Sequence, residues 1–136
     1  MLLRFSGCLM LCAVLLTTTG CSRGGGDGPK LYPVAGRVTF DGKPVASGEI
    51  VFAATDGSHI AGAQIVDGEY SLKAAAGKKK VQITALRDVP GEFREDNPGE
   101  SVQVREMYIP PQYNSQSMLE VNVEKANEDV NFDLAP

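Results

Sequence analysis

Residues 61–73 read AGAQIVDGEYSLK, and this stretch decides the fold. Apolar residues alternate with small or polar ones as far as Ile65, the pair Asp67-Gly68 interrupts them, and the alternation resumes at Tyr70 and Leu72. Alternation at period two is typical of a strand with one buried face, and Asp-Gly between two such runs is a strong hairpin signal. The stretch therefore predicts two antiparallel strands joined by a tight turn.

The same pattern recurs along the chain, with further Asp-Gly pairs at residues 41–42 and 56–57. It predicts seven short strands, around residues 34–40, 49–53, 61–65, 70–73, 81–85, 119–123 and 130–134. No convincing helical period accompanies them. Many short strands separated by turn residues favour an all-β fold, a seven-stranded antiparallel β-sandwich.

One long segment, from Arg87 to Ser117, interrupts this pattern. A stretch of this length without regular structure inside a compact domain is either functional or contains a missed element. We expect Glu92–Glu100 to be a solvated loop and Ser101–Met107 to form an extra edge strand. The three lysines just before the fifth strand, Lys78–Lys80, are expected to be solvated and to protect an edge from further pairing.

The first 20 residues have the parts of an export signal. Arg4 is the only charge before Arg23, and an apolar run extends from Phe5 to Leu16. This run is too short for a bilayer span, which needs roughly 20 residues. We therefore expect a signal peptide at residues 1–20 that is removed, a Gly-rich tether at residues 21–31, and one domain at residues 32–136.

Gly20-Cys21 resembles the lipobox of bacterial lipoproteins, although Thr18 stands where that family prefers Leu. The resemblance implies cleavage before Cys21 and a diacylglycerol on its sulfur. Two or three acyl chains would give stable anchoring, because one chain alone binds membranes only marginally. The alternative is an ordinary cleaved signal that leaves Cys21 as a thiol. The other cysteines, Cys8 and Cys12, lie inside the signal, so the domain has no disulfide.

Residues 34–45, VAGRVTFDGKPV, resemble the opening of carboxypeptidase regulatory-like domains, and Asp67–Leu72 followed by Gly77 and Val81–Ile83 resembles their core motif. Ile109–Asn114 with the last two strands resembles the ending of small bacterial lipoproteins built on that domain. The resemblance implies a transthyretin-like Greek-key sandwich and no particular activity. A ureidohydrolase family with this fold ends in Tyr-Arg-Gly-Ser, whereas this chain ends in Asp-Leu-Ala-Pro, so that activity should be absent.

Charge and residue types argue against most catalytic classes. Without Arg4 the chain has 12 basic and 17 acidic residues, which makes it a poor candidate for nucleic-acid binding. The single histidine, His59, neighbours Ser58 near an expected loop tip, but sequence neighbours rarely form a nucleophile–base pair. One histidine and no free thiol make zinc improbable. The acids of the long segment lack the spacing of a calcium loop; they are Asp88, Glu92, Glu95, Asp96 and Glu100.

These observations predict a monomeric, non-enzymatic envelope lipoprotein that serves as a binding or structural module. We expect no catalytic residue, no metal, and no cofactor other than lipid on Cys21. Ser22 after the cysteine, rather than Asp, is compatible with sorting to the outer membrane, by analogy with lipoproteins. We expect the protein to face the periplasm there, and the cell surface stays open as the alternative. The partners would be the membrane, through the anchor, and an envelope protein or polysaccharide.

The expected partner-binding residues lie in an aromatic-proline stretch, because aromatic residues are enriched at interfaces and binding residues concentrate on loops. They are Tyr108, Ile109, Pro110, Gln112, Tyr113 and Asn114, together with the 87–100 loop. The alternative for the two tyrosines is packing over an open end of the sandwich. An envelope enzyme that acts on carbohydrate or peptide stays open as a second function, and a pocket with converging polar groups would point to it.

Overall fold

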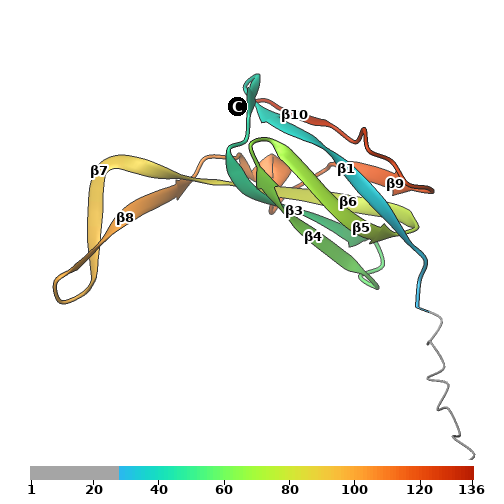
Figure 1. The fold of residues 1–136 in the computed structure, drawn as a ribbon, viewed down its shortest axis with the longest axis horizontal. Coiled ribbons are helices and arrows are strands. Elements are labelled where there is room, and N and C mark those ends of the chain that lie inside the picture. Colours follow the sequence, from blue (N-terminus) through green and yellow to red (C-terminus); the bar gives the residue numbers. More distant parts are fainter. Residues whose placement is uncertain (1–27) are drawn as a thin grey trace, which may run out of the picture.

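The structure is a computed structural model that describes residues 28–136. The predicted signal peptide and Cys21 lie outside the described residues. Within them the fold is all-β, as predicted, with one short 3₁₀ helix and no α-helix (Figure 1). The elements are β1 (Leu31–Phe40), β2 (Lys43–Pro44), β3 (Ser47–Ala54), β4 (Ile60–Val66), β5 (Glu69–Ala75), β6 (Gly77–Thr84), β7 (Leu86–Asn97), β8 (Glu100–Met107), η1 (Pro111–Tyr113), β9 (Glu120–Val123) and β10 (Phe132–Leu134).

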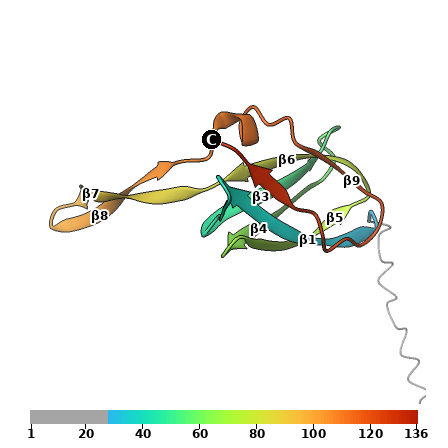
Figure 2. The same cartoon turned by 90° about the horizontal axis from the view of Figure 1, so that it is seen from above.

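The seven predicted strands are all present, as β1, β3, β4, β5, β6, β9 and β10. They form one continuous sheet in the order β10-β1-β5-β4-β3-β6-β9, with β2 added to the end of β1. All pairs in it are antiparallel except β1 with β10. The sandwich prediction is therefore only partly met, because a single sheet curls into a half-barrel where two separate sheets were expected (Figure 2).

The curl occurs between β4 and β5, which pair only at Val66 and Glu69. Their shared turn is the predicted Asp67-Gly68 pair, and both residues have a positive φ, of 51° and 79°. The chain needs glycine at position 68 for a second reason, since an added Cβ would lie 2.7 Å from the Cβ of Pro44. A tight turn that keeps the two strands paired at one end lets them diverge at the other, so the sheet bends without breaking.

The connection from β9 to β10 closes the open side of the half-barrel. It runs along β1, where Asn127 exchanges backbone hydrogen bonds with Pro33 and Ala35. At Gly36 the approach is so close that an added Cβ would lie 1.8 Å from the carbonyl oxygen of Val130. The buried Tyr70 hydroxyl donates a 2.7 Å hydrogen bond to the same carbonyl. Gly36 therefore leaves the space in which this crossing segment can dock.

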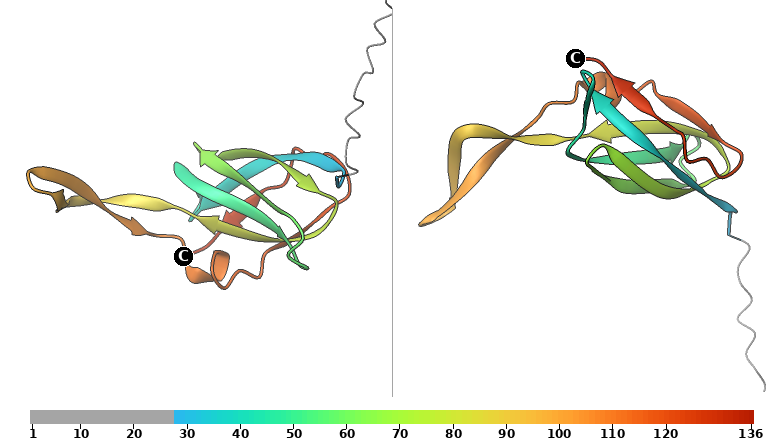
Figure 3. Two further views of the ribbon diagram at one scale, coloured as in Figure 1. Left: turned by 90° about the horizontal axis from the view of Figure 1, so that it is seen from below. Right: turned by 45° about the horizontal axis from the view of Figure 1, so that its top comes forward.

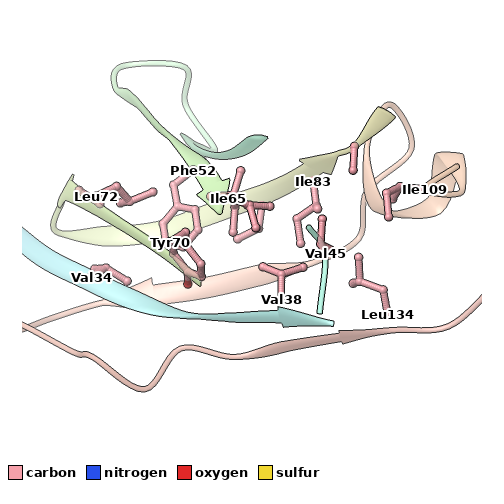
Figure 4. Packing of buried hydrophobic residues seen from close by; sticks show 14 of the residues in the cluster. Val34, Val38, Val45, Phe52, Ile65, Tyr70, Leu72, Ile83, Ile109 and Leu134 are labelled. Atoms are coloured by element: carbon pink, nitrogen blue, oxygen red, sulfur yellow. The ribbon is translucent and has the colours of Figure 1, made fainter. Parts of the chain in front are cut away.

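The core lies inside the curl, where side chains from β3, β4 and β6 point toward those from β1 and β5 (Figure 4). Phe52, Tyr70 and Phe132 form an aromatic cluster with ring centroids 6.1–6.4 Å apart. All buried cluster members lie between Val34 and Leu134. A chain that begins at Gly28 therefore retains every described strand and every described member of the core, so we expect it to fold as an independent domain.

The remaining two strands, β7 and β8, form a separate two-stranded ribbon that leaves the body after β6 (Figures 1 and 3). We call this ribbon, Leu86–Met107, the arm. The prediction of a solvated loop at Glu92–Glu100 is wrong, because β7 continues to Asn97 and the turn occupies residues 98–99. The predicted strand at Ser101–Met107 is confirmed as part of β8, although its partner is β7 and not the edge of the main sheet.

Candidate functional site

The arm is bent by an irregularity in its pairing. Asp88 pairs with Arg105 and Phe93 with Gln103, so four residues of β7 oppose a single residue of β8. The Gln103 side-chain amide spans this bulge by donating hydrogen bonds to the backbone carbonyls of Val89 and Glu92. Bulges bend the strand that contains them and redirect its side chains. The bend is thus stabilised by a specific side chain.

The arm contributes no residue to the buried core, and almost every one of its side chains is exposed. Ion pairs cross it at Arg87–Glu106 and Asp88–Arg105, with N–O distances of 2.7 and 3.4 Å. Phe93, which follows the bulge, has 61% of its surface exposed. The arm contains six carboxylates and three arginines, a formal net charge of −3. A two-stranded ribbon without a hydrophobic face is only marginally stable by itself in water.

Tyr108 lies where the arm returns to the body. Its ring meets Phe40 edge-on at a centroid distance of 5.5 Å, and the Arg87 guanidinium lies 5.5 Å from its centroid. Burial raises the pKa of the Tyr108 hydroxyl, and the positive charge of Arg87 opposes this rise. Tyr108 therefore joins the base of the arm to the first strand of the body.

The other predicted partner-binding residues mainly hold the chain in place. Ile109 is buried in the core, so its side chain is not available to a partner. Asn114 donates hydrogen bonds to the carbonyls of Ile109 and Pro110, and the Tyr113 hydroxyl accepts one from the Ala135 amide. Gln112 is the exposed member of the group. This is the packing role that the sequence left open for the tyrosines.

A second feature lies at the other end of the body, where β4 and β5 have diverged. A pocket of about 410 Å³ opens between Ile60–Gly62 and Lys73–Ala75 and is completed by Leu31, Phe52, Ser58, His59 and Lys79. We call this pocket the cleft. It lies beside the first residues of β1, where the described chain begins (Figure 1). Its lining includes two lysines and a histidine and no carboxylate.

The prediction that all three lysines of 78–80 are solvated is wrong for Lys79, because only 3% of its surface is exposed. It alternates with Val81 and Ile83 on the inward face of β6, and Lys78 and Lys80 are exposed. The period-two pattern contained this signal, but the run of three lysines concealed it. Among residues 28–136, no carboxylate lies within the 4.0 Å ion-pair limit of its ammonium.

His59 lies at the β3–β4 loop, as predicted, and the loop geometry does not resemble a catalytic pair. The His59 Nδ1 atom contacts the backbone carbonyl of Ser58 and not its hydroxyl. The Ser58 amide donates to the Asp56 carboxylate at 2.9 Å. Hydrogen bonding from the Ser58 side chain, and after it from this amide, lowers the pKa of Asp56. Acyl-transfer catalysis requires a hydrogen bond between the nucleophile and its base, and Ser58 and His59 do not make one.

Residues 28–136 contain no group of three or more His, Cys, Asp or Glu side chains placed to hold a metal ion. In the same residues no helix is long and apolar enough to cross a bilayer.

No protein-family model and no curated protein matches the chain. Among solved structures, a DUF3823 family protein from Parabacteroides merdae is 19% identical, with a TM-score of 0.41 over 80% of this chain and 48% of that one. A 9R-lipoxygenase from Cyanothece is 13% identical, with a TM-score of 0.39 over 78% of this chain and 16% of that one. This chain thus spans about half the length of the first protein. Similarity at this level transfers no activity.

Proposed function

We propose that this chain is a lipid-anchored envelope protein without catalytic activity, whose curled sheet is a scaffold that presents the arm to a partner. The observation that carries the proposal is the arm itself. It extends from the body, adds nothing to the core and exposes Phe93 just beyond its bulge. Exposed aromatic side chains on projecting elements are typical of recognition surfaces.

The position of the arm supports an anchor at Cys21. Leu31, near the start of the described chain, lines the cleft, and the arm leaves the body at the opposite end (Figures 1 and 3). A segment of nine residues with the Gly-rich composition of Ser22–Lys30 would span about 15–20 Å if it behaved as a random coil. The eight residues of β8 span a further 25 Å or so as a strand. An anchored protein would therefore hold its arm well clear of the membrane.

The charge distribution supports the same orientation. The net negative charge of the arm would be repelled by anionic lipid, and the cleft end has the lysines. In this proposal the protein faces the periplasm from the outer membrane, acts as a monomer, and offers the arm to an envelope protein or polysaccharide.

We also infer that the body is related to carboxypeptidase regulatory-like domains. The supporting residues are those of the sequence motif, and each has a structural role. Gly42 and Gly68 have positive φ in the two tight turns, and Leu72 points into the core. These roles explain the motif through folding, and they assign no activity to it.

The anchor is tested by metabolic labelling with a fatty-acid probe in cells that express the full chain. The wild type should be labelled and found in the membrane fraction, and Cys21→Ser should be unlabelled and released. Equal labelling of both proteins, or of neither, would contradict the anchor.

The arm is tested separately by photocrosslinking in intact cells. A crosslinking residue at position 93 should give a discrete product. The matched control is position 66, because Val66 is equally exposed, at 62%, but lies on the body. The recognition role fails if position 93 gives no product or gives the same products as position 66.

A further inference from the structure

The geometry of the cleft points to a binding site for a phosphoryl group, and we propose that Lys79 is its central ligand. The site lies on the body, away from the arm, and the phosphoryl site itself does not depend on an anchor at Cys21. Only the idea that a membrane lipid supplies the group rests on the proposed function.

The first argument is the burial of Lys79. Lysine is almost never buried to this degree unless its ammonium has an anionic partner. Within residues 28–136 no carboxylate is in ion-pair contact with Lys79, and the Asp56 carboxylate is only close enough for the Lys79 charge to contribute to lowering the pKa of Asp56. None of the described side-chain nitrogens is both sealed from solvent and without a hydrogen-bond partner, and Lys79 lines the cleft. The inward face of β6 otherwise contains Val81 and Ile83, so an aliphatic residue would suit folding at position 79. An anionic ligand would supply the missing partner.

The second argument is the set of groups around it. Lys73 and His59 line the same cleft, as does Ser58, and no carboxylate does. His59 uses Nδ1 to contact the Ser58 carbonyl, which leaves Nε2 free for a ligand. Two ammonium groups and an imidazole suit a phosphoryl group, because its several oxygens can accept hydrogen bonds from more than one cationic donor at once.

The third argument is the backbone. Beyond their pairing at Val66 and Glu69, the facing edges of β4 and β5 have no strand partner among the described residues. Unpaired backbone N–H groups at such an edge are hydrogen-bond donors. The divergence of the two strands thus creates both the volume of the cleft and donors along its walls.

The rim of the cleft favours a phospholipid headgroup over free phosphate. Ile60 and Leu31 expose 72% and 52% of their surfaces there, beside the lysines. Apolar side chains next to basic ones suit a membrane interface, where the apolar groups enter the acyl boundary and the cations meet phosphates. With an anchor at Cys21, this end of the body would face the bilayer.

The test uses the domain beginning at Gly28, which retains the whole core. Two probes are titrated: inorganic phosphate, followed by amide chemical shifts, and vesicles of phosphatidylcholine with or without phosphatidylglycerol, followed by sedimentation. Lys79→Met keeps the length of the side chain and removes its charge. Lys80→Met is the matched control, because Lys80 is the next residue and points outward. Lys73→Met is a second variant in case Lys79→Met does not fold.

We expect phosphate to shift the amides of residues 58–61 and 73–79, and affinity to fall at least about tenfold in Lys79→Met with little change in Lys80→Met. Binding to phosphatidylglycerol vesicles with the same variant dependence identifies lipid as the source. Binding to phosphate alone supports the site with a soluble phosphate as ligand. Absence of binding to both probes, or equal losses in the two variants, overturns the proposal. A failure of fatty-acid labelling at Cys21 would leave these results unchanged, so the two hypotheses fail separately.

Discussion

The body and the arm are both built mainly from paired antiparallel strands and differ in what those strands bury. In the body, every second residue along β3 and β6 points inward to a common core, where Phe52 is 1% exposed. In the arm, β7 and β8 pair along most of their length apart from the bulge, and Phe93 is mostly exposed. The difference shows that strand pairing sets the secondary structure, whereas burial sets the stability, because hydrophobic burial dominates the free energy of folding.

The sharpest test of this difference is to replace a phenylalanine with alanine once in the body and once in the arm. Phe52→Ala should lower the free energy of unfolding by about 3–5 kcal/mol, since it opens a cavity within the aromatic cluster. Phe93→Ala should change it by no more than about 0.5 kcal/mol. Chemical denaturation of the domain beginning at Gly28 measures both values. Similar losses for the two variants would mean that the arm shares the stability of the body.

Closure of the half-barrel depends on Gly36. Gly36→Ala should destabilise the domain by at least about 2 kcal/mol, because its Cβ would overlap the Val130 carbonyl and displace the crossing segment. Gly62→Ala is the control, since its Cβ would meet neighbouring atoms at ordinary distances of 3.6–3.7 Å. Thermal unfolding of both variants compares them. Equal stabilities would show that the crossing segment is not needed to hold the body together.

Tyr70 links the core to the same crossing segment. Tyr70→Phe should cost about 1–2 kcal/mol, because the Val130 carbonyl loses its hydrogen bond. Burial raises the pKa of the Tyr70 hydroxyl well above its ordinary value of 10.0.

This pKa difference has a direct consequence for stability at high pH. The folded state keeps the Tyr70 proton where the unfolded state releases it. The free energy of unfolding therefore keeps its full value below about pH 10 and declines above it, by up to about 1.4 kcal/mol per pH unit. Denaturation between pH 8 and pH 11.5 should show this decline in the wild type and a shallower one in Tyr70→Phe. Identical slopes would show that Tyr70 is not the group responsible.

Removal of the whole arm should have only a small effect on the stability of the body. The amide of Tyr108 donates to the carbonyl of Ala85 at 3.3 Å, so the two ends of the arm are already adjacent. Replacing residues 86–107 with a short Gly-Ser turn loses the Arg87–Tyr108 contact and shortens the loop. These changes oppose each other, and the net change should stay within about 1 kcal/mol. A loss of cooperative unfolding would contradict this independence of body and arm.

Local pattern predicted the strands well, because period-two alternation and Asp-Gly turns depend on residues near in sequence. All seven expected strands and the turns at Asp41-Gly42 and Asp67-Gly68 are present. The arm was partly missed. Its β7 strand contains Pro90, Gly91 and a run of charged residues, and its pairing depends on a bulge held by Gln103. No periodic signal accompanies a strand without a buried face.

The candidate sites also have one part that local sequence predicted and another that depends on residues distant in the chain. Composition placed the tyrosines of the 108–114 stretch at a surface, but their packing against Phe40 and near Ala135 depends on strands far away in sequence. The cleft has no sequence signature, because its residues come from five separate segments.

The sequence by itself determined the all-β class, the strand positions and the tight turns, since each follows from neighbouring side chains and backbone freedom. Only the tertiary structure decided that one sheet curls at the β4–β5 corner, that Gly36 admits the crossing segment, and that Lys79 points inward. These features arise from contacts between segments distant in the chain, where burial and close packing decide which side chains can be accommodated.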